Sequence, residues 1–174
     1  MNNRFQLFYW AMVAIAILLS AVTATGQTVA LGEINASAGE EVIVPLNFTD
    51  ITAAGSAAFY IEFNQDVLTY VNFQNAIPEL SGNALIVNYI PGLYLTIQWF
   101  TLSSAVNFPD GTAIELIFDY AGGDTDVSFI EGSYVKDASN PPNTLAVTFV
   151  NGSVTGQSGS DQSAWNGTGN WMEE

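Results

Sequence analysis

Apolar and polar side chains alternate along most of this chain, from about residue 28 to residue 155. After a turn at residues 110–111, for example, Leu116 and Phe118 alternate with Glu115 and Asp119. A repeat of two residues is typical of a strand that buries one face and exposes the other. The pattern, interrupted by Gly, Pro and Asn, predicts nine strands: Thr28–Leu31, Glu41–Phe48, Ala57–Asn64, Leu68–Phe73, Ala84–Ile90, Leu93–Thr101, Ala113–Tyr120, Val127–Val135 and Leu145–Thr155.

The apolar row of each strand predicts the core. Its main members are Phe59, Ile61, Phe63, Leu95, Ile97, Trp99, Leu116, Phe118 and Phe149. The inward row of strand 93–101 is expected to begin at Leu93. A further inward row consists of Val42, Val44, Leu46 and Phe48. Within the latter, Pro45 predicts an edge strand or a bulge, since proline has no N–H to donate to a neighbouring strand.

Short strands at this spacing predict an all-β fold, a nine-stranded antiparallel sandwich or jelly roll. No segment after the N-terminal region shows the 3.6-residue period of a helix. About 150 residues are enough for one domain with one core.

The first residues have the pattern of a signal peptide. Arg4 precedes an uncharged apolar run over residues 11–19, which is short for a membrane span, and small residues allow cleavage after Ala24 or Gly26. The alternative is an uncleaved N-terminal anchor. We therefore expect a signal peptide at 1–26, a domain at 27–156 and secretion to the cell surface or medium, with no membrane insertion after cleavage.

The last residues differ in composition from the domain. Residues 157–174 begin as a Gly/Ser linker and end with Trp165 and Trp171. We interpret them as a linker with the possible start of a further, truncated module, or as a disordered natural terminus.

Charge excludes several kinds of partner. The chain has 17 acidic residues, and its only basic residues are Arg4 and Lys136. Nucleic acid and anionic membranes need Lys and Arg to replace their counterions. The acidic residues are spread along the chain, as on a solvated outer surface.

Catalysis is not expected. The chain has no His and no Cys, which excludes histidine-containing triads, histidine-ligated metals, thiol chemistry and disulfides. Only a carboxylate pair would remain. Glu62, Glu115 and Asp119 are predicted to face solvent, where a carboxyl group lacks the raised pKa of an acid catalyst.

Asp124 and Asp126 are the best candidate metal ligands. Two carboxylates at i and i+2 beside two glycines resemble part of a calcium loop. Calcium requires six or more oxygen atoms as ligands. Only Asp110 or Asp137, from other loops, could add oxygen atoms to those of Asp124 and Asp126. The alternative interpretation is a polar turn that binds no cofactor.

Four segments in order, residues 41–48, 57–70, 110–118 and 147–154, resemble a cohesin domain. The resemblance covers about residues 28–155 and implies a nine-stranded jelly roll that presents a flat sheet face to a calcium-loaded dockerin module. One departure is Asn64-Gln65, where the family commonly has Asp-Pro.

We expect the partner-binding face on strands 57–64, 84–90 and 93–101. Its predicted members, which alternate with the apolar rows, are Tyr60, Glu62, Asn64, Asn88, Tyr94, Thr96 and Gln98. The favoured function is a secreted, non-catalytic module that binds a dockerin-like partner in polysaccharide-degrading assemblies. The alternatives are direct polysaccharide binding, which needs exposed rings such as Tyr60, Tyr94 and Phe100, and a structural spacer in a surface protein.

Overall fold

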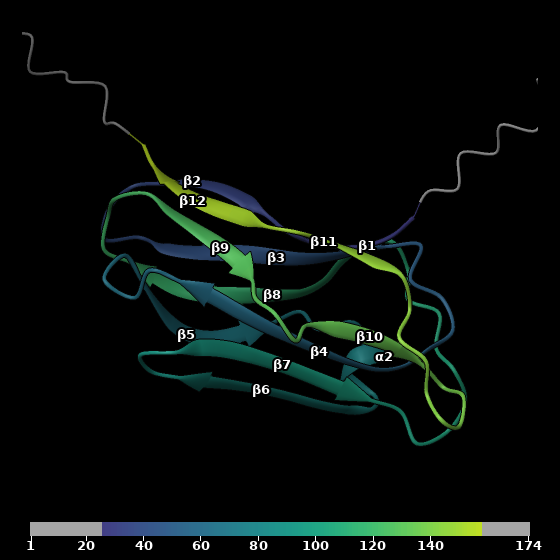
Figure 1. Ribbon diagram of the computed structural model, residues 1–174. Coiled ribbons are helices and arrows are strands. Elements are labelled where there is room, and N and C mark those ends of the chain that lie inside the picture. The colour runs from purple at the N-terminus through teal and green to yellow at the C-terminus, as the bar shows by residue number, and fades with distance from the viewer. Residues whose placement is uncertain (1–25, 158–174) are drawn as a thin grey trace, which may run out of the picture.

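The computed structural model describes residues 26–157, which form two facing β-sheets with one short helix (Figure 1). The predicted signal peptide, except for Gly26, and all of the tail beyond residue 157 lie outside the described residues. The five-stranded sheet has the order β11 (Val147–Val150), β1 (Gln27–Leu31), β3 (Glu41–Thr49), β8 (Gly111–Tyr120), β5 (Leu68–Gln74). No helix within residues 26–157 is long and apolar enough to cross a membrane.

The second sheet is seven-stranded. Its order is β2 (Glu33–Ala36), β12 (Gly152–Gly156), β9 (Thr125–Phe129), β4 (Ala54–Phe63), β7 (Tyr94–Phe100), β6 (Ala84–Ile90), and β10 (Tyr134–Asp137) pairs with β4 beyond the end of β9. The helix α2 (Pro78–Ser81) is a single turn before β6. The all-β sandwich is thus confirmed, and the single turn α2 is too short to show the 3.6-residue period of a helix.

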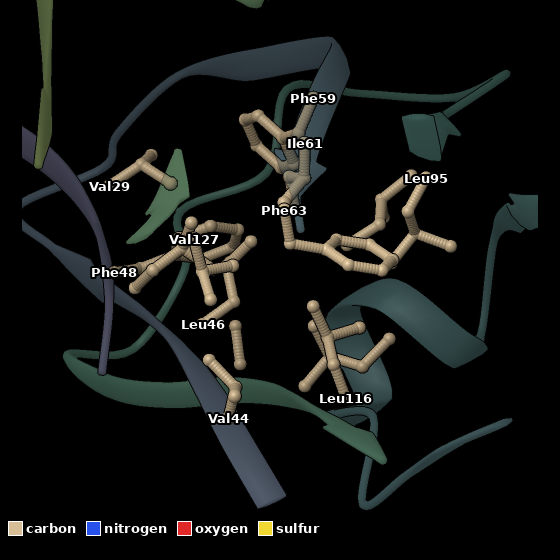
Figure 2. Packing of buried hydrophobic residues seen from close by; sticks show 14 of the residues in the cluster. Val29, Val44, Leu46, Phe48, Phe59, Ile61, Phe63, Leu95, Leu116 and Val127 are labelled. Carbon is tan, nitrogen blue, oxygen red and sulfur yellow. The ribbon is translucent and has the colours of Figure 1, made fainter. Parts of the chain in front are cut away.

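The predicted core rows lie between the two sheets (Figure 2). Side chains of β3 and β8 face those of β4 and β7, and eight of the nine predicted core residues are buried. Phe149 is only partly buried and packs on the edge of the core. Leu93 was wrongly placed in the inward row: it lies in the turn between β6 and β7 and is exposed.

The chain passes between the sheets twice, which the predicted strands did not anticipate. The first strand is followed by β2, on the other sheet, after Gly32, and the predicted strand 145–155 is divided into β11 and β12 at Asn151. The β1–β11 and β2–β12 pairs are parallel, so the sandwich is not wholly antiparallel. Residues 127–135 are likewise divided, by a turn at residues 130–133. Residues 26–157 therefore contain twelve strands where nine were predicted.

Pro45 lies in a central strand, so the prediction of an edge strand was wrong, although a register shift follows at Leu46 and Asn47. The proline is tolerated because β1 ends beside it. There the Gly32 N–H donates a hydrogen bond to the Pro45 carbonyl at 2.9 Å.

We expect Gly32→Ala to destabilise the domain by about 1–3 kcal/mol, the usual range for overpacking. A Cβ at Gly32 would lie 2.6 Å from Cγ and Cδ of Pro45. Urea denaturation measures the change, and Gly26→Ala is the control because nothing lies within 4 Å of its Cβ position. Equal stability of the two variants would show that the proline ring moves aside without cost.

Candidate functional site

The outward-pointing residues of β9, β4, β7 and β6 make one continuous surface, here called the outer face. These four strands are neighbours in the sheet and lie side by side in Figure 1. Tyr60 is paired with Thr96, and Thr96 with Asn88, so the three side chains form a row across β4, β7 and β6. The structure thus brings most of the predicted partner-binding residues onto one surface.

The predicted residues differ in accessibility. Glu62, Asn88 and Gln98 are exposed, and Tyr60 and Tyr94 are partly exposed. Thr96 is only 5% exposed, and its hydroxyl donates to the Asn88 carbonyl at 3.2 Å. These exposed side chains, and that of Asn64, which is also exposed, are therefore more accessible to a partner than Thr96.

Asn64 ends β4 and shapes the following turn. Its side-chain Oδ1 accepts a hydrogen bond from the Asp66 N–H at 3.0 Å, and its carbonyl accepts from the N–H groups of Val67 and Leu68. An Asn side chain that bonds two residues onward stabilises a turn by itself. This side-chain hydrogen bond maintains the turn at the position where the resemblance implied Asp-Pro.

Two tyrosines form the middle of the outer face. The rings of Tyr60 and Tyr94 are 5.6 Å apart at an interplanar angle of 89°. Edge-to-face packing of this kind stabilises both side chains. Because the rings are perpendicular, they do not offer the single flat platform that stacking on a sugar requires.

A pocket of about 520 Å³ adjoins the outer face at the end of β4. It is lined by Glu62, Asn64, Gln65, Asp66, Leu93 and Asp126, among others. Gln65 was not among the predicted binding residues, but it stabilises the wall of this pocket. Its Oε1 accepts hydrogen bonds from the Tyr89 hydroxyl and the Gly92 N–H, both at 2.7 Å. The carboxylates of Glu62, Asp66 and Asp126 make the pocket acidic.

The carboxylates considered for catalysis do not meet. Glu62 is on the outer face of the seven-stranded sheet, whereas Glu115 and Asp119 belong to β8 in the other sheet. Glu115 accepts hydrogen bonds from Gln74 and Asn75 at 2.9 and 2.7 Å. Glu62 therefore has no catalytic partner in Glu115 or Asp119.

The candidate calcium ligands Asp124 and Asp126 both line a second pocket, together with Ser153 and Thr155. Asp124 accepts a hydrogen bond from the Gly156 N–H at 3.0 Å, while Asp126 also lines the pocket at the end of β4. Asp110 and Asp137 are engaged in other loops. Among the described residues, no three His, Cys, Asp or Glu side chains are grouped to hold a metal ion. Calcium binding stays a prediction.

Asp137 instead organises the loop after β10. Hydrogen bonds from the Ser139 hydroxyl, and then from the backbone and side chain of Asn143, hold the pKa of its carboxyl well below the usual range. These bonds favour the charged form, so they stabilise the fold above the unfolded pKa, near 3.8, and are lost as the pH falls through the folded pKa.

We therefore expect Asp137→Asn to lower the melting temperature slightly at neutral pH. The difference from the wild type should persist down to about pH 4 and shrink progressively below it, because the carboxyl group of the unfolded chain is protonated first and that of the folded protein follows at lower pH. Thermal melts from pH 2 to 7 measure it, with the exposed Asp66→Asn as control. A difference that is constant over this range would contradict the role of the charge.

The comparisons with known proteins agree on one family. The family model described as "Cohesin domain" matches residues 27–164. Among curated proteins, no sequence matches this chain.

Several solved structures share the fold. The sixth cohesin of scaffoldin B from Acetivibrio cellulolyticus, in complex with a mutant Cel5 dockerin, is 18% identical, with 75% of this chain and 99% of that chain covered and a TM-score of 0.65. A non-cellulosomal cohesin from the archaeon Archaeoglobus fulgidus is 15% identical, with 76% and 91% covered and a TM-score of 0.64. The cohesin of an OlpA–Doc918 complex from Clostridium thermocellum is 16% identical, with 76% and 99% covered and a TM-score of 0.64.

Proposed function

Because this chain belongs to the cohesin family, whose domains are non-catalytic binding modules, we propose that it binds a dockerin-type protein through its outer face. The observation that carries the proposal is the family match, which spans every described strand. Some of the similar structures are themselves complexes of a cohesin with a dockerin.

The composition of the outer face supports protein binding. Tyr60 and Tyr94 have uncharged polar side chains nearby, such as Asn88 and Gln98, and Glu62 is the charged residue that follows Tyr60 in the outward row of β4. Aromatic side chains with few charges at the centre are typical of protein interfaces. The perpendicular tyrosine rings favour this function over direct polysaccharide binding.

The proposed setting is extracellular. The apolar segment at residues 11–19, with small residues up to Gly26, supports export and cleavage. Residues 27–156 are then the binding module, and residues 157–174 a Gly/Ser linker with the possible start of a further, truncated module. In this arrangement the module recruits dockerin-bearing proteins to a cell-surface or secreted assembly that degrades polysaccharides.

The test is a binding titration of the full chain against a panel of calcium-loaded dockerins. We expect at least one to bind with a dissociation constant of about 1 μM or tighter, equivalent to about −8 kcal/mol. The same protein is tested for retention on insoluble cellulose. If folded protein binds no dockerin but is retained by cellulose, the carbohydrate alternative replaces the proposal.

A further inference from the structure

The outer face differs in chemistry between its two ends. Of the seven large apolar residues that are exposed among the described residues, four lie in the β6–β7 hairpin or just after it: Ile86, Leu93, Phe100 and Leu102. The other three, Ile43, Val71 and Val150, belong to strands of the five-stranded sheet. Exposed apolar side chains that gather on one surface mark interaction sites.

Ile86 and Phe100 form an apolar end of the outer face. Ile86 is paired with Gln98 and Phe100 with Ala84, so the two side chains are diagonal neighbours on adjacent strands. Such neighbours are about 7 Å apart, within reach of large side chains. Ile86 is 51% exposed and Phe100 is 40% exposed, and Leu102 follows directly after the strand.

The opposite end is acidic. Glu62 and Asp126 line the pocket together with Asp66, and Leu93 lies at its rim. Lys136 is the only basic residue within the described part of the chain, and it is at the other end: it pairs with Ser56, which in turn pairs with Phe100. Ser56 and Glu62 are six residues apart on β4, or about 20 Å at 3.3 Å per residue.

We infer that the outer face accepts its partner in a single orientation, with large apolar side chains over Ile86 and Phe100 and a Lys or Arg side chain at the acidic pocket. This inference rests on the proposed function and specifies the contact surface of the dockerin-type partner. The two ends are about 20 Å apart, so an interface of ordinary size covers both.

Charge decides the orientation. A partner that covers Glu62 and Asp126 without supplying a positive charge leaves carboxylates desolvated and unpaired, which is costly. A partner turned by 180° places its apolar side chains on these carboxylates and its basic side chain near Lys136. Both contacts are unfavourable, and such repulsive elements select one binding mode over another.

Cross-linking from each end tests the orientation. The chain has no cysteine, so Leu102→Cys and Leu93→Cys each create one labelling position for a photoreactive group. The probe is the tightest-binding dockerin of the panel. We expect the two positions to cross-link to separate segments of the dockerin, with a Lys or Arg near the segment reached from Leu93. If both positions cross-link to the same segments of the dockerin, the single orientation is overturned.

Affinity variants test the chemistry of each end. We expect Ile86→Ala with Phe100→Ala to weaken binding about tenfold or more, the loss expected for apolar hot-spot residues. Ile43→Ala is the control, since Ile43 is 39% exposed on the other sheet, and it should leave binding unchanged. Equal affinity of the Ile86/Phe100 variant and the control would overturn the apolar end.

We expect Glu62→Gln with Asp126→Asn to slow association and to reduce the dependence of affinity on salt between about 50 and 500 mM. The control is Glu41→Gln with Asp119→Asn, a paired acidic couple on the five-stranded sheet. An unchanged salt dependence in the Glu62/Asp126 variant would overturn the acidic end. If these variants still bind a dockerin, the proposed function remains supported. If the wild type binds no dockerin, both the proposed function and the single orientation are overturned.

Discussion

Trp99→Ala is expected to lower the free energy of unfolding by about 3–5 kcal/mol, the range for truncation of a buried aromatic residue. Trp99 is 1% exposed, and its ring packs edge to face on Phe108 with 4.9 Å between the centroids. Phe108 in turn contacts Phe48 of the opposite sheet at the same distance. The indole therefore contributes to packing between both sheets, and its loss leaves a cavity at their centre.

The indole also has a polar role. Its Nε1–H donates to the Glu79 carbonyl of α2 at 3.0 Å. Trp99→Phe removes this bond but retains most of the packing, and the Glu79 carbonyl still accepts a hydrogen bond from the Asn83 side-chain amide at 3.0 Å. We therefore expect a smaller loss of about 0.5–1.5 kcal/mol, the net contribution of one hydrogen bond. Urea denaturation followed by circular dichroism measures both variants. A loss below about 1 kcal/mol for Trp99→Ala would contradict the core position of this side chain.

The strands were predictable because one row of each strand enters a single core. The period of two holds from Ile114 to Tyr120 in β8 and from Phe59 to Phe63 in β4, and these buried rows were assigned correctly. The sheet crossings were missed although the sequence contains a signal for them. Inward positions are odd up to Leu31 and even from Ile34, and the same change separates Phe149 from Val154. A single continuous strand cannot change its parity without a break.

The binding face was predictable only in part. On β7 the inward row is apolar and the outward row mostly polar, so the faces could be distinguished. On β6 both rows contain large aliphatic side chains, with Ile86 in one and Val87 in the other, so the pattern could not show that Ile86 is exposed. The burial of Thr96 and the use of Gln65 in the pocket wall depend on neighbours that are distant in sequence.

These differences bear on which side chains carry binding energy. Thr96 has little surface to offer, and Asn64 uses its Oδ1 in a turn. Tyr60 and Gln98 remain accessible at the centre of the outer face, on neighbouring strands. They are therefore the pair whose removal should affect binding most and the fold least.

Tyr60→Ala with Gln98→Ala is expected to weaken binding of a dockerin about 30- to 100-fold. Truncation of a central Tyr hot spot costs about 2 kcal/mol or more, and 1.4 kcal/mol corresponds to a factor of ten. Loss of the Tyr60 ring also frees Tyr94 from its edge-to-face contact. Calorimetric titration of the full chain measures the change in affinity.

The fold should survive this double substitution, because neither side chain belongs to the buried cluster between the sheets and the backbone bonds of Tyr60 to Ser133 and Ile130 remain. Urea denaturation should show a loss no larger than about 1 kcal/mol. Ile43→Ala with Thr69→Ala, on the outer side of the five-stranded sheet, serves as the matched control and should bind as the wild type does. If the control loses affinity while Tyr60→Ala with Gln98→Ala binds at full strength, recognition takes place on the five-stranded sheet instead.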